Sequence, residues 1–99
     1  LLVCEGGDIG RAAIWANNEP MRIQNHIHRL RAYVPVCTRF FYYLFYLYKG
    51  AGWIGGKGIA IQGLSSNAIH NLLFPLPPLA EQHRIVSAID KALNLVQKL

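Results

Sequence analysis

Phe74 to Asp90 reads FPLPPLAEQHRIVSAID. This stretch determines the secondary structure of the C-terminal part of the chain. Pro77 and Pro78 have no backbone N–H to donate, and each holds the residue before it in an extended conformation. After them the chain contains no glycine or proline as far as Leu99, and it is rich in residues that favour helices. The sequence therefore predicts extended chain that changes into a helix at Leu79.

One face of this predicted helix is apolar. Residues that recur at steps of four, three, four and three form an a/d pattern, and two more widen the face; the set is Ile85, Val86, Ile89, Ala92, Leu93, Val96 and Leu99. Such a helix is roughly 30 Å long, which is more than a small β-rich lobe covers. We therefore predict that this face pairs with another helix, in the manner of a coiled coil.

Two partners and one alternative stay open for this face. The partner helix lies either elsewhere in a longer parent chain or in a second copy of the same chain. The alternative is a terminal helix that folds back onto its own lobe. The pattern covers about two and a half heptads, whereas three to four are typical of a coiled coil, so the repeat alone does not choose between these possibilities.

Three short segments near the N-terminus favour strands. Leu1 to Glu5 is apolar and ends at a glycine-rich turn, and Ile9 to Ala16 follows that turn as a second apolar segment. Residues 21 to 32 alternate imperfectly between apolar and polar side chains, which indicates one or two half-exposed strands. The first third of the chain is therefore predicted to be a small β arrangement.

A change of pattern follows at Pro35. Apolar and aromatic residues from Val36 to Tyr48 recur at helical spacing, although aromatic residues also suit strands. We predict a helix with Pro35 in its first turn, because proline is tolerated there. Lys49 and Gly50 would end it, since a cation and then a glycine fit a helix C-terminus.

The segments together predict an α+β fold. A glycine-rich loop from Gly50 to Gly63 leads to a short helix at residues 68–72, for which residues 65–67 supply N-cap side chains. We expect a β-rich lobe with an aromatic helix over residues 1–76 and a helical segment over 77–99. Ninety-nine residues fit one small domain. Because the first residue is leucine rather than methionine, we expect the chain to be a piece of a longer protein.

Composition narrows the class of protein. Lys and Arg number 10 against 5 Asp and Glu, a net charge of +5 that favours polyanionic partners, although a merely solubilising surface explains it equally well.

The two cysteines, Cys4 and Cys37, have no disulfide or zinc spacing, so free thiols in a reducing cytoplasm are expected. The aromatic run from Phe40 to Tyr48 is far shorter than the about 20 residues of a membrane span. No basic segment of a signal peptide precedes the apolar start. We therefore expect a cytoplasmic protein with no membrane partner.

Cations and amide side chains gather in the first third of the chain. Arginine pairs with guanine or phosphate, and asparagine and glutamine pair with adenine. The lysine in GGKG lies where bare backbone could approach a phosphate. For each residue alone a solvated surface position is at least as good an explanation, but the cluster from Arg22 to Arg31 favours DNA. The predicted DNA-binding residues are Arg11, Arg22, Gln24, Asn25, His26, His28, Arg29, Arg31 and Lys57.

Catalytic and cofactor sites find little support in the sequence. His26 and His28 share a face if they lie on a strand, but no spacing supplies the third ligand that a metal needs. The GGKG segment lacks the flanking residues of a phosphate-binding P-loop. Ser66 and His70 lie four apart, which favours a helix cap and a surface histidine over a catalytic pair. We predict no catalytic residue, no metal and no cofactor.

The quoted stretch also resembles a known family. LSSNAIHNLLFPLPPLAEQHRIVSAID, Leu64 to Asp90, is similar to the end of a target recognition domain in the specificity subunit of type I restriction-modification systems. GDIGRAAI and VPVCTRFFYYLF, together with the glycine-rich segment, resemble the upstream part of such domains more loosely. The matching motif residues are Pro75, Pro77, Pro78, Leu79, Glu81, Gln82, Arg84, Ile85, Val86 and Asp90.

The resemblance implies a role and a set of partners. Subunits of this family carry two recognition domains, and two long helices pair antiparallel as a spacer that docks the methyltransferase subunits. By this resemblance residues 1–76 are part of a recognition domain and 77–99 begin a spacer or dimerisation helix. The expected partners are double-stranded DNA and the modification and restriction subunits, with a homodimer through the C-terminal helix as a further possibility. Adenine methylation with S-adenosylmethionine and cleavage with ATP would belong to the other subunits.

Two other functions remain as alternatives to sequence-specific DNA recognition. The chain could be a protein–protein interaction module that uses its C-terminal helix and has no DNA surface. It could also be a small enzyme such as a nuclease, although no pair of carboxylates at a useful spacing supports that.

Overall fold

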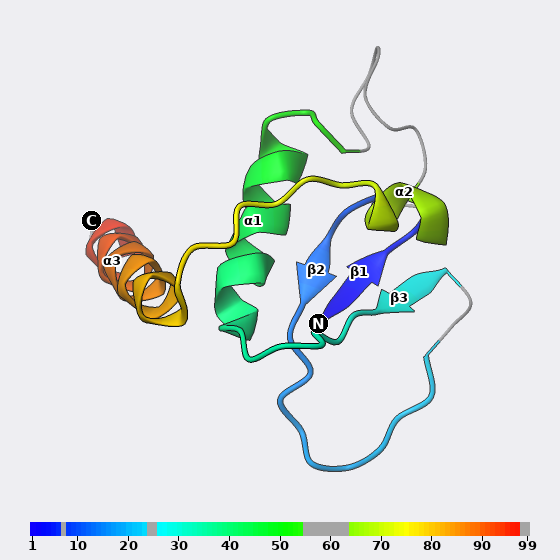
Figure 1. Ribbon diagram of the computed structural model, residues 1–99, viewed down its shortest axis with the longest axis horizontal. Helices are drawn as coiled ribbons and strands as arrows, with labels where there is room; N and C mark the ends of the chain where they lie inside the picture. The colour runs from blue at the N-terminus through cyan, green and yellow to red at the C-terminus, as the bar shows by residue number, and fades with distance from the viewer. Residues whose placement is uncertain (7, 24–25, 55–63, 98–99) are drawn as a thin grey trace.

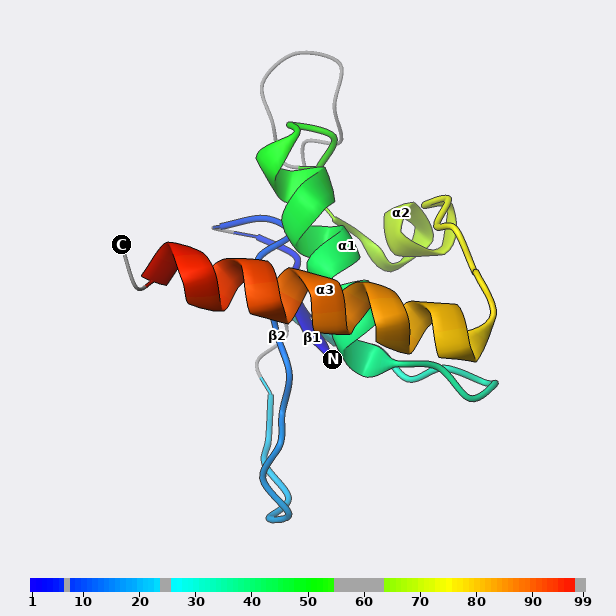
Figure 2. The same cartoon turned by 90° about the vertical axis from the view of Figure 1, so that its left-hand side faces the viewer.

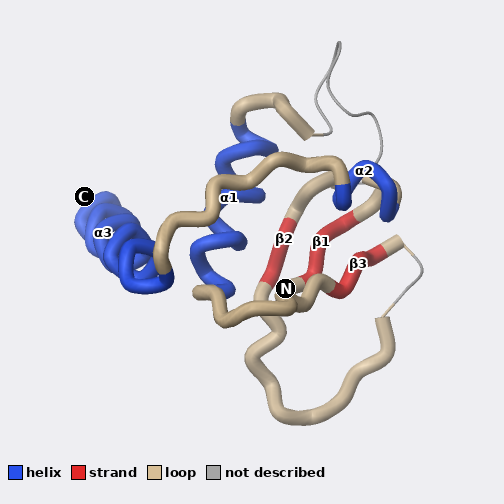
Figure 3. Tube along the Cα trace, viewed as in Figure 1, coloured by secondary structure: helices blue, strands red, loops and turns tan. Residues whose placement is uncertain are grey.

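The computed structural model describes residues 1–6, 8–23, 26–54 and 64–97. Three strands and three helices follow one another along these residues (Figures 1 and 3). The α+β class predicted from the sequence is confirmed. The elements in chain order are β1 Leu2–Cys4, β2 Ala12–Ala13, β3 Ile27–Arg29, α1 Thr38–Gly50, α2 Ser66–His70 and α3 Leu79–Gln97.

The strands form one small antiparallel sheet in the order β2-β1-β3. Val3 at the centre of β1 is fully buried, and it lies opposite Ala12 on β2 and His28 on β3. Because paired residues of neighbouring strands share a face, these three side chains point toward the core. Leu2 lies opposite Arg29, so this arginine belongs to the other face of the sheet.

The turn between β1 and β2 requires a glycine. Gly10 has a φ of 84°, in the left-handed region that residues with a side chain rarely adopt, and its N–H donates to the Cys4 carbonyl at 3.0 Å. A Cβ atom at this position would lie 3.1 Å from Cγ2 of Ile54, which is itself buried in the core. The second glycine of GDIG therefore closes the turn and lets the core approach it.

Helix α1 lies between the sheet and α3 (Figure 1). Phe45 on its inner side is buried with Val3, Ile54 and Leu64 to form the main core. Phe74, from the extended chain that precedes α3, stacks edge-on against Phe45 with ring centroids 5.1 Å apart. The aromatic run predicted to be a helix is therefore confirmed as one, and its inner residues build the core.

The ends of α1 differ from the prediction. The helix begins at Thr38 with Cys37 as its N-cap, so Pro35 lies before the helix and not in its first turn. At the other end the helix includes Gly50, and the glycine with the left-handed conformation is Gly52, at a φ of 76°. The terminating glycine is therefore two residues later than predicted, because the last turn is long enough to include Gly50.

Helix α2 is short and capped as the sequence suggests. The Ser65 hydroxyl accepts a hydrogen bond from the Ala68 N–H at 3.1 Å, which satisfies one of the free donors of the first turn. The helix covers Ser66–His70 and so begins two residues before the predicted start. Most of the glycine-rich loop ahead of it lies outside the described residues.

The chain between β2 and β3 does not pack against the body. Within the predicted strand region at residues 21–32, of which 24 and 25 lie outside the described residues, Ile27–Arg29 is the described strand. Residues 14–23 instead form a broad loop that projects away from the sheet and helices, as Figures 1 and 2 both show. The loop is exposed apart from a half-buried Ile14.

Candidate nucleic-acid interface and helix-docking surface

Charged side chains divide into two groups in this fold. On the helical side, three cations are each held by an acid; the pairs are Lys49–Asp8 at 2.6 Å, Arg39–Asp90 at 2.9 Å and Arg84–Glu81. Hydrogen bonds from Lys49 and Arg84 lower the pKa of Asp8 and Glu81 respectively. The positive charges of these cations are therefore largely offset by neighbouring carboxylates.

On the other side, three arginines have no such partner. Arg22 lies on the projecting loop, Arg29 on β3 and Arg31 just beyond it, and all three are exposed. Within the described part of the chain no acidic side chain lies within 4.0 Å of their guanidinium groups. Three of the nine predicted DNA-binding residues are thus exposed positive charges without an acidic neighbour among the described residues, and two of them, Arg29 and Arg31, line one pocket.

The other predicted DNA-binding residues are placed differently. His28 faces the core side of the sheet, where its Nε2 lies 2.5 Å from the Leu64 carbonyl and 3.8 Å from the Glu5 carboxylate. Its ring is therefore occupied by contacts within the fold. His26 is exposed beside β3, and Arg11 is exposed 3.9 Å from Asp8. Three further predicted residues lie outside the described residues: Gln24, Asn25 and Lys57.

A second feature of the fold is the crossing of α3 over the outer side of α1 (Figure 2). Val86 is buried there with Cys37 and Phe40, and Ile85 is half-buried beside them. Of the predicted partner-facing residues, Val86 is thus already covered by this chain's own helix. Burying a side chain of this size contributes roughly 1.5–3 kcal/mol, so the crossing is a fixed part of the fold.

A buried glutamine locks the first turn of α3. Gln82 is only 2% exposed, and its Oε1 accepts the Cys37 N–H at 2.9 Å while its Nε2 donates to the Pro77 carbonyl at 2.9 Å. One side chain thus joins the start of α1 to the proline segment that leads into α3. The sequence held a signal for this role, because Gln82 lies three residues before Ile85 and so is a polar residue in register with the apolar face.

A polar cluster closes the same crossing nearer the middle of α3. The Asp90 carboxylate accepts hydrogen bonds from the Tyr43 hydroxyl and from Arg39, whose Nη2 also donates to Tyr43 at 3.1 Å. The Tyr43 hydroxyl and then Arg39 lower the pKa of Asp90, and the carboxylate in turn raises the pKa of Tyr43. Arg39 is therefore part of the helix junction.

Beyond this cluster α3 leaves the lobe. Every side chain from Lys91 to Gln97 is exposed, and Leu93, Leu95 and Val96 are 46%, 67% and 63% exposed. The apolar face of α3 is thus divided: its first half packs on α1, and the side chains of its second half, up to Gln97, are exposed. Leu99, the last predicted partner-facing residue, lies outside them.

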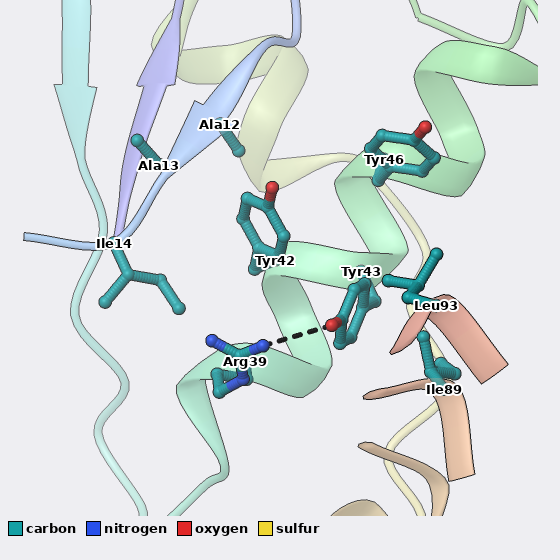
Figure 4. A pocket seen from close by; sticks show the side chains of 9 residues that line it. All are labelled: Ala12, Ala13, Ile14, Arg39, Tyr42, Tyr43, Tyr46, Ile89 and Leu93. Carbon is teal, nitrogen blue, oxygen red and sulfur yellow. Dashed lines mark hydrogen bonds between the residues drawn. The ribbon is translucent and has the colours of Figure 1, made fainter. Parts of the chain in front are cut away.

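Two apolar grooves flank the crossing. One, of about 480 Å³, lies between β2, α1 and α3, with Tyr42 and Tyr46 on one wall and Ile89 and Leu93 on the other (Figure 4). The other, of about 610 Å³, lies where Ile85 and Ile89 meet the C-terminal half of α1. Ile89 lines both grooves, so it has open space on two sides of the helix.

Some kinds of site are absent from the described residues. No three His, Cys, Asp or Glu side chains there are grouped in a way that could hold a metal ion. Cys4 and Cys37 are both free thiols. None of the helices in this part of the chain has the length and apolar character needed to cross a membrane.

Two curated relatives resemble this chain over nearly its whole length. A relative from Haemophilus influenzae, provisionally named the type I restriction enzyme specificity subunit S.HindORF215P, is 32% identical over 100 residues that cover 100% of this chain and 25% of the relative. The EcoBI specificity subunit of Escherichia coli is 32% identical over 97 residues, which cover 97% of this chain and 20% of the relative. The chain thus spans a quarter or less of the curated relatives it matches, and no solved structure matches it significantly. The family model described as the type I restriction modification DNA specificity domain matches residues 1–99, so the chain belongs to that family.

Proposed function

We propose that this chain recognises DNA as part of a type I restriction-modification specificity protein. One observation carries the proposal: Arg22, Arg29 and Arg31 are exposed with no acidic side chain of the described residues within 4.0 Å, while Arg39, Lys49 and Arg84 are each paired with an acid. DNA phosphates attract such uncompensated charge, and phosphate contacts supply much of the affinity of a DNA-binding protein. The sequence specificity named in the family and in both relatives supports the same role.

Salt should weaken this binding steeply. Each phosphate contact contributes about −0.9 to the slope of log affinity against log salt concentration, because bound counterions are released. Three arginine contacts alone should then lower affinity by about fortyfold between 50 and 200 mM salt. Titration of the full-length protein against duplex DNA by fluorescence anisotropy at several salt concentrations measures this slope. Binding that does not change with salt would argue against the proposed surface.

We propose further that the exposed half of α3 docks a partner helix in the assembled enzyme. Support comes from its position: Gln82 and Asp90 hold the first half of the helix against α1, so the apolar residues beyond Asp90 project from a fixed base. On this view residues 77–99 form a spacer helix and residues 1–76 belong to a recognition lobe. The proposed docking partner is the modification subunit, and catalysis is proposed to lie in the partner subunits.

Replacing Leu93 and Val96 together with aspartate should abolish this docking. Both residues are exposed, so the lobe should fold normally, whereas two carboxylates in an apolar helix interface are strongly unfavourable. Co-purification of the full-length protein with the modification subunit measures the result, and light scattering shows whether a second copy is the partner instead. Asn94→Asp, which adds a charge to the same turn away from the apolar face, is the matched control. Association that survives the double substitution unchanged would show that this face is not the interface.

The alternative of an interaction module without a DNA surface has one observation in its favour, which is this exposed apolar half of α3. This alternative gives no role to Arg22, Arg29 and Arg31. The two proposals are separated by the arginine substitutions described in the Discussion.

A further inference from the structure

The projecting loop between β2 and β3 has a defined tip. The chain bends at Asn18 and Glu19, and both backbone polar groups of Glu19 are held by side chains of the loop. The Glu19 N–H donates to Oδ1 of Asn17 at 3.0 Å, and its carbonyl accepts the indole N–H of Trp15 at 3.2 Å. Pro20 restricts Glu19 further, because the residue before a proline is confined to extended conformations. The backbone at the tip is therefore positioned while the Glu19 carboxylate is left exposed.

Glu19 is also an exception among the acids of this chain. The protein has five Asp and Glu residues, all within the described residues, and four of them lie within 4.0 Å of a cationic or histidine side chain. Only Glu19 has no such partner in the described part of the chain. It lies instead on the loop that projects from the body (Figures 1 and 2), and it lines one pocket together with Arg29 and Arg31.

The two kinds of charge along the loop favour different parts of DNA. An element that only gripped phosphates would carry a cation at its tip, because a carboxylate there repels the backbone. Here the tip carries an amide and a carboxylate, and the cations lie behind it. Carboxylates accept hydrogen bonds from the cytosine amino group, and asparagine pairs bidentately with adenine, both in the major groove. Asn17 uses its oxygen within the loop, whereas Asn18, at the bend, is exposed.

We propose that Asn18 and Glu19 are base-reading residues, held at the tip of the loop by Asn17 and Trp15, while Arg29 and Arg31 contact phosphates at its base. This inference rests on the proposed DNA-recognition function. The major groove, about 12 Å wide, admits a two-stranded element, whereas the minor groove, about 6 Å wide, does not. The loop is broad in Figure 1 and thin in Figure 2, a shape that suits edge-on entry into a groove. One pocket of about 390 Å³ is lined by Asn18 and Glu19 together with Arg29 and Arg31, so the proposed base-reading and phosphate-contacting residues border the same space.

Selection from a pool of duplexes with a randomised central segment tests this inference. The full-length protein selects bound sequences, and Glu19→Gln and Asn18→Ala proteins repeat the selection. The expected result is a preference that is lost or changed by about tenfold at one or two base pairs and unchanged elsewhere, since one bidentate base contact discriminates by about 1–3 kcal/mol. The salt dependence of binding should stay the same, because no phosphate contact is removed. Arg29→Gln combined with Arg31→Gln should do the reverse, weakening all sequences alike and reducing the salt slope by about 2.

The matched control is Asn67→Ala, which removes an exposed amide from α2 on another part of the lobe. It should select the same sequences as the unmodified protein. If the tip variants also select those sequences, the tip does not read bases, and the inference is overturned while the proposed function stands. If the unmodified protein enriches no sequence at all, the inference and the proposed function both fail.

Discussion

Replacing Arg22, Arg29 and Arg31 together with glutamine should lower the affinity of the full-length protein for duplex DNA by about a hundredfold or more at 0.1 M salt. The reason is that each guanidinium is exposed with no carboxylate of the described chain beside it, so each is free to displace counterions from a phosphate. The slope of log affinity against log salt concentration should fall by about 3. Anisotropy titrations at four or five salt concentrations measure both quantities.

The matched control removes charge from the opposite side of the molecule. Arg84→Gln with Lys91→Gln takes two cations from exposed positions on α3. Affinity for DNA should change little if the arginine surface is the binding site, and about as much per charge if net charge alone attracts DNA. The interaction-module alternative predicts that the triple substitution leaves the activity of the assembled enzyme unchanged, and that outcome would remove DNA recognition from this lobe.

Gln82→Leu should lower the free energy of unfolding by about 2–4 kcal/mol. Leucine is close in size to glutamine, but it can neither accept from the Cys37 N–H nor donate to the Pro77 carbonyl, and an unsatisfied buried polar group costs about 1–3 kcal/mol. Urea denaturation followed by circular dichroism gives the unfolding free energy. The same substitution at exposed Gln97, near the other end of α3, is the matched control and should change stability by less than about 0.5 kcal/mol.

Hydrogen exchange shows where the stability is lost. If Gln82 joins α3 to α1, the amides of the first turns of both helices should exchange faster in the variant, while β1 and β3 keep their protection. Uniform loss of protection throughout the lobe would instead mean that Gln82 supports the main core and not the helix junction.

Short-range patterns were enough to predict the types and order of the elements. The prolines and the apolar repeat placed the start of α3 at Leu79, and helical spacing identified α1 despite its aromatic content. Ser65 marked the cap of α2. These predictions depend on interactions within a few residues, which a single sequence records. Errors arose at the ends of α1. Pro35 lies outside the helix, whose N-cap Cys37 donates its N–H to Gln82, a partner 45 residues away that a local pattern does not reveal.

The functional surfaces were only partly predictable. The cluster from Arg22 to Arg31 was identifiable in the sequence as a run of cations and amides. A list of basic residues does not show, however, which of them form ion pairs with acids in the folded chain. Arg39 finds Asp90 at a separation of 51 residues, and Lys49 finds Asp8 through the packing of α1 on the β1–β2 turn. His28 was predicted to bind DNA like its neighbours, but it faces inward because of the register between β1 and β3.

From its residues alone the chain specifies an α+β lobe, a proline-led terminal helix with one apolar face, and a family resemblance carried mainly by the residues after Leu64. Tertiary packing settles which half of that face α1 covers, which arginines keep their charge free, and how Glu19 comes to stand at the tip of a projecting loop. The physical reason is the separation along the chain over which each kind of interaction acts. Turn chemistry and helical periodicity act between near neighbours, whereas burial and ion pairing depend on segments far apart in the chain that meet only when it folds.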